Sequence, residues 1–231
     1  MAAAKHTGRI IGAMLLIQMV GGALDNFVLM APVHATPGYL VNATLHSTRV
    51  GISALVGLSV GLLSVGIAIA AFTAFSRHSL TAALWLVALA VAGLSAAAVE
   101  NGNVMSLLSL SQSYAKAGLD DPALYPALRQ VVAAARNWSH YIGMIISGLM
   151  LLVFYGSLFR FTLIPRALAA AGIAAVLLQL GTVSAPLFGR DAPLPMLLPL
   201  FVVQLTTALW LIARGFQSAA VGSMRDERQP P

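Results

Sequence analysis

The sequence predicts an all-α polytopic integral membrane protein: one bundle of six transmembrane helices with both termini in the cytoplasm. Hydrophobic residues make up 59% of the 231 residues and charged residues only 9%, whereas a soluble domain averages about 25% charged residues. The mean hydropathy is +0.87. Crossing a hydrocarbon core of about 30 Å takes roughly 20 apolar residues in a helix. Six stretches qualify, at about 10–30, 50–75, 80–112, 126–159, 167–187 and 194–213.

The first three stretches are marked off by single basic residues. Lys5 and Arg9 precede the first, Arg49 opens the second and Arg77 follows it, and the third is apolar from Leu80 onward. Strict alternation of apolar and polar residues, which a transmembrane β-barrel requires, does not occur in them. These stretches are therefore expected to be helices that end where the basic residues stand.

The first stretch could instead be a signal peptide, since a basic start and an apolar run lead to Val33-His34-Ala35, a possible cleavage site. Asp25 and Asn26 interrupt that run before the cleavage site, so the first stretch is better interpreted as a transmembrane span, which brings the number of spans to six.

The last three stretches end or begin at basic residues in the same way. The fourth ends at Arg160, Pro165 and Arg166 open the fifth, and Arg214 closes the sixth. Before the fourth, Gly118 could cap the third helix, and Asp121-Pro122 could cap the fourth, so both helices are expected to project beyond the bilayer as a hairpin. One transmembrane domain over 1–222 follows, with a disordered polar tail at 223–231.

The net charge of +6 and the isoelectric point near 10.3 do not indicate nucleic-acid binding, because the basic residues stand singly at helix ends and form no patch. They set orientation instead, since cytoplasmic loops carry an excess of Lys and Arg. The bias predicts that both termini of a multi-pass protein are cytoplasmic, with the lipid bilayer as partner, and it leaves the oligomeric state open. The bacterial inner membrane is the expected location. The cytoplasmic side would hold Lys5, Arg9, Arg77, Arg160, Arg166, Arg214, Arg225 and Arg228, and the outer side Arg49, Lys116, Arg129, Arg136 and Arg190.

Polar residues inside the predicted spans gather toward the outer side. Ionisable groups at membrane depth are costly, and they usually face the bundle interior and pair with one another. An outward-opening polar pocket above an apolar inner half is therefore expected. Its candidate ligand-binding residues are Asp25, Asn26, Arg49, Glu100, Asn101, Asn103, Asn137, His140, Tyr141, Gln179 and Gln204, and the candidate acid–base residues among them are Asp25, Glu100 and His140.

Several of these residues also have a structural interpretation. Arg49 is either an interface anchor or the counter-charge of Asp25 or Glu100, and Gln18 and Gln204 are expected to make hydrogen bonds between helices. Glu100 and the asparagines that follow it could mark the point where the helix leaves the lipid. Cysteine is absent, and no ligand pair has the spacing of a zinc site, so neither a metal nor a cofactor is expected.

Short motifs along most of the chain resemble the bacterial membrane proteins grouped as domain of unknown function 4386. The resemblance implies six helices and supplies no activity, and Gln204 stands where similar chains often have a carboxylate. The motifs are Arg9-Ile10-Ile11-Gly12, the acidic Asp25, Ser47-Thr48-Arg49-Val50-Gly51, Glu100-Asn101-Gly102-Asn103, His140-Tyr141-Ile142-Gly143 with Gly148 and Leu149, Pro165-Arg166-Ala167-Leu168, and Leu209-Trp210-Leu211-Ile212.

Three functions remain open at this point. The first is binding or handling of an amphipathic small molecule or lipid, whose head would occupy the polar pocket. The second is a membrane-embedded enzyme that acts on a lipid or isoprenoid through Asp25, Glu100 and His140. The third is a proton- or ion-coupled transporter, for which intramembrane carboxylates are expected but a polar path through the inner half is lacking.

Overall fold

The described part of the chain, residues 2–117 and 124–217 of a computed structural model, is a bundle of long helices without a strand. Six helices are long and apolar enough to cross a membrane, as predicted. The predicted caps at Gly118 and Asp121-Pro122 and the tail at 223–231 lie outside the described residues. The main helices are α1 (Ala2–Leu24), α4 (Ser47–Phe75), α5 (Leu80–Ala117), α6 (Leu124–Arg160), α7 (Arg166–Ser184) and α8 (Leu198–Arg214).

The six helices form a closed ring in which each contacts the next along the chain and α8 returns to α1. The first helix is a full member of this ring. A Cβ at Gly12 of α1 would lie 2.7 Å from the backbone oxygen of Ala208 in α8, so glycine allows the two backbones to approach closely. Ile11 and Leu15 of α1 are buried in the core.

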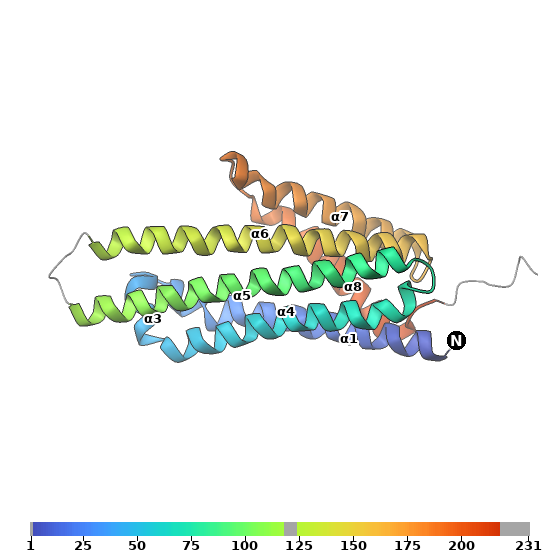
Figure 1. The fold of residues 1–231 in the computed structure, drawn as a ribbon, viewed down its shortest axis with the longest axis horizontal. Helices are drawn as coiled ribbons and strands as arrows, with labels where there is room; N and C mark the ends of the chain where they lie inside the picture. Colours follow the sequence, from blue (N-terminus) through green and yellow to red (C-terminus); the bar gives the residue numbers. More distant parts are fainter. Residues whose placement is uncertain (1, 118–123, 218–231) are drawn as a thin grey trace, which may run out of the picture.

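The helices differ in length, and this shapes the two ends of the bundle (Figure 1). We call the end that holds the start of α1 and the end of α8 proximal, and the opposite end distal. Helices α5 and α6 have 38 and 37 residues, about 57 and 55 Å at 1.5 Å per residue, and they extend beyond the others at the distal end. The predicted long third and fourth helices are therefore present. The third continues past the expected end at 112, to Ala117, and the fourth begins before the expected start at 126, at Leu124.

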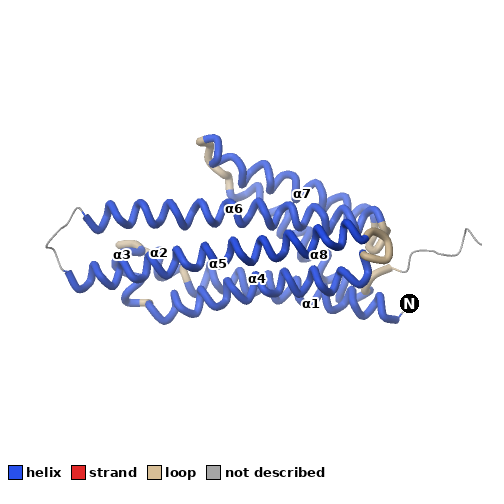
Figure 2. The backbone as a smooth tube through the Cα atoms, in the orientation of Figure 1, coloured by secondary structure: helices blue, strands red, loops and turns tan. Residues whose placement is uncertain are grey.

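Short elements occupy the distal end beside α5 (Figure 2). Helix α1 continues into η1, a π-helical turn over Asp25–Leu29, and then into the short helix α2, Ala31–His34. Helix α3, Tyr39–Leu45, packs against α5, where the buried Ser111 hydroxyl donates to the Leu40 carbonyl at 2.7 Å. The 3₁₀ turns η2 (Ala185–Phe188) and η3 (Leu194–Leu197) join the end of α7 to the start of α8.

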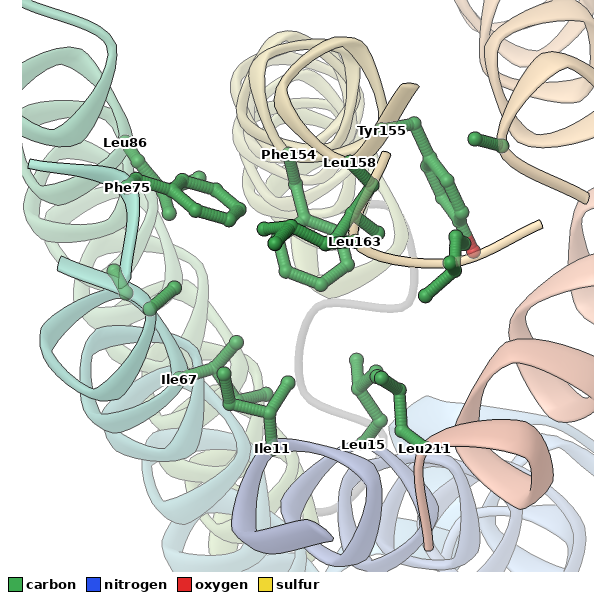
Figure 3. Close-up of a cluster of buried hydrophobic side chains, with 14 of the residues drawn as sticks. Ile11, Leu15, Ile67, Phe75, Leu86, Phe154, Tyr155, Leu158, Leu163 and Leu211 are labelled. Atoms are coloured by element: carbon green, nitrogen blue, oxygen red, sulfur yellow. The ribbon is translucent and has the colours of Figure 1, made fainter. Parts of the chain in front are cut away.

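Two apolar clusters fill the interior. The proximal cluster is the larger one and draws side chains from all six long helices, among them Phe75, Phe154, Tyr155 and Leu211 (Figure 3). The distal cluster contains Met30, Val33, Tyr39, Ala43, Val50, Val104, Leu107 and Leu108. Between these two clusters along the bundle axis, α1, α4, α5 and α6 carry polar residues. We call these residues the polar layer, and they form the candidate site.

Candidate functional site

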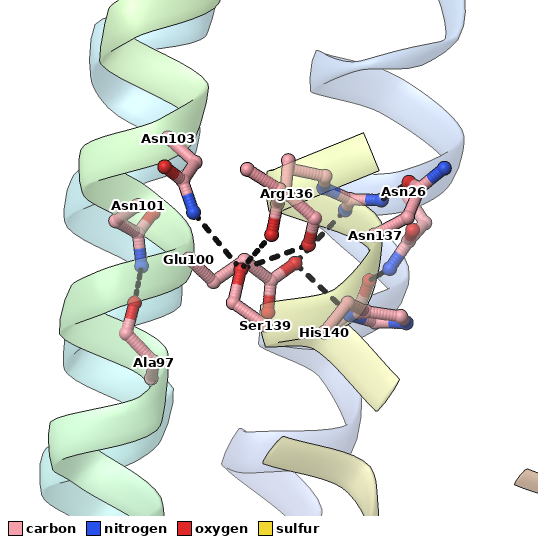
Figure 4. Close-up of polar contacts among 11 residues, drawn as sticks. Asn26, Ala97, Glu100, Asn101, Asn103, Arg136, Asn137, Ser139 and His140 are labelled. Atoms are coloured by element: carbon pink, nitrogen blue, oxygen red, sulfur yellow. Dashed lines mark hydrogen bonds and ion pairs between the residues drawn. The ribbon is translucent and has the colours of Figure 1, made fainter. Parts of the chain in front are cut away.

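The polar layer is built around Glu100 of α5 and a stripe of residues on α6 (Figure 4). His140 Nδ1 and Arg136 Nη2 both lie 2.9 Å from the same oxygen, Oε1 of Glu100. Arg136 and His140 are four residues apart, so they stand one above the other on one face of α6. The Glu100 and Arg136 side chains are only 21% and 31% exposed, so this ion pair is largely removed from solvent.

A second α5–α6 contact lies beside the first. Asn103 donates from Nδ2 to the Ser139 hydroxyl at 3.1 Å, one turn along α5 from Glu100. Asn101 turns away from this contact: its amide donates to the Ala97 carbonyl at 2.8 Å and lies against Gly57 of α4. The structure therefore brings Glu100, Asn103 and His140 together, as expected, and places Asn101 on the α4 side.

Asp25 reaches the polar layer from the π-helical turn of α1. Its carboxylate interacts electrostatically with Arg136, Glu100 and His34, and Ser53 of α4 faces it. Its Oδ1 atom is buried and has no hydrogen-bond partner in the described part of the chain. Asn26, next in sequence, is exposed and donates to the Gly22 carbonyl of its own helix, so it lies outside this layer.

Arg49 is not the counter-charge of either carboxylate, because Arg136 takes that place at Glu100. Its Nη1 atom instead donates to the Val28 carbonyl at 3.2 Å. Pro32 has no N–H with which to bond that carbonyl four residues back, and the Val33 N–H donates to Met30. Arg49 therefore satisfies a carbonyl that the helix interruption leaves open, and its role as an interface anchor stays a prediction.

Three glutamines, in α1, α7 and α8, differ in their contacts. Gln179 is buried in α7, and its amide donates to the Met144 carbonyl at 3.4 Å, while its Oε1 has no hydrogen-bond partner among the described residues. The expected hydrogen bond of Gln204 to another helix is not formed within the described residues. Gln18 does bond between helices, to the Ser64 hydroxyl at 2.5 Å. Tyr141 packs beside His140, with ring centroids 6.1 Å apart.

A cavity of about 210 Å³ opens next to the polar layer, between α2, α3, α5 and α6. Asn137 is the one predicted site residue in its wall. The other lining residues are Met30, His34, Tyr39, Val104, Leu107, Arg129, Ala133 and Arg136. The wall of the cavity therefore combines polar and basic residues with apolar ones.

Burial and charge act on the two titratable residues that α2 and α3 contribute to this cavity. Burial lowers the pKa of His34, and the nearby Arg136 and Arg129 lower it further, so the imidazole is neutral near pH 7. Burial also raises the pKa of Tyr39 to about 12. The Tyr39 hydroxyl donates to the Val104 carbonyl at 3.3 Å, which holds α3 against α5.

Sequence reasoning missed Arg136, Arg129, His34 and Tyr39. The two arginines had a detectable signal, because positions 129, 136 and 140 lie at intervals of seven and four residues, which place them on one face of a helix. His34 and Tyr39 follow an interruption of the first helix, so no fixed helical period could place them.

One family model matches the chain over residues 10–215, and it is described as a domain of unknown function, DUF4386. No curated protein and no solved structure matches the chain. The match covers most of the sequence, including α1 from residue 10 onward, the other five long helices and every residue of the polar layer. The chain therefore belongs to the DUF4386 family of unknown function.

Proposed function

We propose that this multi-pass membrane protein binds a small amphipathic molecule or a lipid, with its polar head in the distal cavity. The observation that carries the proposal is the mixed lining, in which Arg129 and Asn137 of α6 stand in the same wall as the apolar Val104 and Leu107 of α5. A ligand with a polar head and an apolar body matches such a wall.

The height of the cavity supports a ligand drawn from the membrane. If Arg160 marks one edge of the hydrocarbon, His140 stands about 30 Å above it and Arg129 about 46 Å, at 1.5 Å per residue. Hydrocarbon is about 30 Å thick, and the head groups extend a bilayer to about 40–45 Å in all. The outer head groups then reach to about 35–38 Å, so the polar layer lies at the hydrocarbon boundary, Arg136 at about 36 Å lies at the level of the head groups, and Arg129 stands roughly 10 Å beyond them. By the charge bias, this is the outer face of the inner membrane.

Native mass spectrometry of the full chain, purified in mild detergent, tests the proposal. Ala133 lines the cavity, whereas its neighbour Ala134 is exposed and does not. Ala133→Phe should fill the cavity and remove co-purified lipid or small-molecule adducts, and Ala134→Phe should retain them. Equal adduct populations in the two variants and the wild type would show that the cavity is not the binding site.

A second candidate function is acid–base catalysis on a lipid or isoprenoid. The 2.9 Å contact between Glu100 and His140 favours it, since it joins a carboxylate to an imidazole beside the cavity. Mass spectrometry of lipids incubated with protein in nanodiscs tests it. Products formed by the wild type and lost in His140→Gln would support catalysis. If the lipids stay unmodified while lipid adducts persist, the result would support binding without catalysis. Proton-dependent uptake into liposomes, lost in Asp25→Asn, would assign transport instead.

A further inference from the structure

We propose that the group held in the distal cavity is a phosphate, bound between Arg129 and Arg136 of α6 with the Asn137 amide beside them. This inference rests on the proposed function and names the chemistry of the head group.

Charge is the first argument. Among the described residues, no carboxylate lies within ion-pair distance of Arg129, and Arg136 meets Glu100. Neither Glu100 nor Asp25 belongs to the wall of the cavity. Because Glu100 already compensates Arg136, Arg129 is the charge in the wall that lacks a negative partner among the described residues, and an anionic ligand would supply that partner.

The supply of hydrogen-bond donors is the second argument. Two guanidinium groups and the Asn137 amide offer donors to the cavity, and guanidinium has no acceptor. The Tyr39 hydroxyl already donates to Val104, so it contributes only acceptor capacity. A site rich in donors suits an oxyanion, and arginine binds phosphate through strong charge-assisted hydrogen bonds.

Spacing is the third argument. Arg129 and Arg136 are seven residues apart, so they lie on one face of α6 about 10.5 Å apart along the axis. Ala133 stands between them, and its small side chain leaves the space that the cavity occupies. Two long side chains that approach from above and below can contact different oxygens of one tetrahedral group. A planar carboxylate, whose two oxygens lie on one side, fits two such side chains less well.

Size is the fourth argument. One water needs roughly 10–15 Å³ of cavity space, so an open cavity of about 210 Å³ has room for a phosphate and its first ester carbons. The apolar wall of Val104 and Leu107 provides a surface for those carbons. Both a phospholipid head group and free phosphate carry the required chemistry.

Binding of lipids with identical acyl chains to the full chain in detergent, read by native mass spectrometry, tests the inference. Phosphatidic acid should bind, and diacylglycerol, which lacks the phosphate, should bind at least tenfold more weakly. Arg129→Gln should weaken phosphatidic acid binding about tenfold or more, because it removes charge-assisted hydrogen bonds. Lys116→Gln, a matched loss of one positive charge on α5 away from the cavity, should bind like the wild type.

Inorganic phosphate identifies the source of the group. Displacement of phosphatidic acid by millimolar phosphate would indicate a free oxyanion site, and no displacement would indicate a lipid head group; both support phosphate recognition. Equal binding of diacylglycerol, unaffected by Arg129→Gln but lost in Ala133→Phe, would overturn the phosphate inference and leave the proposed function standing. Binding unaffected by Ala133→Phe would overturn both.

Discussion

The Arg136–Glu100 ion pair can be removed from either side, and the outcome should depend strongly on whether one or both partners are lost. Exposed pairs contribute about 0.2–1 kcal/mol, and breaking a buried pair costs about 3–5 kcal/mol. With side chains 31% and 21% exposed and a separation of 2.9 Å, this pair lies between those limits. We expect Arg136→Gln and Glu100→Gln each to lower the free energy of unfolding by about 2 kcal/mol.

The double variant Arg136→Gln/Glu100→Gln should be closer to the wild type than either single variant, because it leaves no unpaired charge at the membrane boundary. Thermal unfolding in detergent, followed by tryptophan fluorescence, measures this. About 2 kcal/mol corresponds to a fall in Tm of roughly 4–8 °C for a chain of this size.

Arg129→Gln is the matched control for this cycle, since Arg129 stands on the same face of α6 and lines the same cavity without a carboxylate partner among the described residues. Its stability should stay within about 0.5 kcal/mol of the wild type, as for most surface substitutions. Equal losses in Arg129→Gln and Arg136→Gln, or strictly additive losses in the double variant, would refute the reasoning that the pair organises the polar layer.

Three further perturbations test other parts of the fold. A Cβ at Gly172 would lie 2.5 Å from Cε1 of the buried Tyr155, so Gly172→Ala should cost about 1–3 kcal/mol in thermal unfolding, whereas Gly181→Ala, with nothing within 4 Å, should not destabilise. The pKa of His34 is lowered in the folded state, so the unfolded state binds more protons below about pH 6.5, and stability should fall as the pH drops. The difference in the free energy of unfolding between wild type and His34→Asn, taken at pH 5 and at pH 7, measures this effect. An identical pH dependence of the two proteins would contradict it. Ser111 is fully buried and bonds two residues of α3, so Ser111→Ala should cost about 1–3 kcal/mol and speed amide exchange in α3; unchanged exchange would show that this contact does not hold α3.

Much of the fold could be predicted because a transmembrane helix leaves a strong local signal. The scarcity of charge and the length of the apolar stretches are enough to place six spans. The helices differ most from the expected bounds at the start of α1, which begins at Ala2 instead of about 10, and at the end of α5, which continues to Ala117. Beyond the bilayer, helix length is decided by packing on neighbouring segments, such as α3 on α5, and hydropathy says little about it.

The candidate site could be predicted only in part, for a related physical reason. Glu100 and His140 were found because a charge and an imidazole stand out near apolar residues. Arg136 did not stand out, since an arginine near the end of a span has the ordinary role of setting orientation. Arg49 bonds a backbone carbonyl, a kind of partner that no inspection of side-chain types can reveal.

The π-helical turn at Asp25–Leu29 has a consequence for the angular phase of the first helix. In an uninterrupted α-helix the nine residues from Asp25 to His34 span about 900° of rotation, two and a half turns, and would place the two side chains on opposite faces. In the structure they interact electrostatically. Deleting one residue from the turn would rotate everything beyond it by about 100°. The π-helical turn, together with the bend at Met30 that follows it, therefore sets the direction in which α2 carries His34.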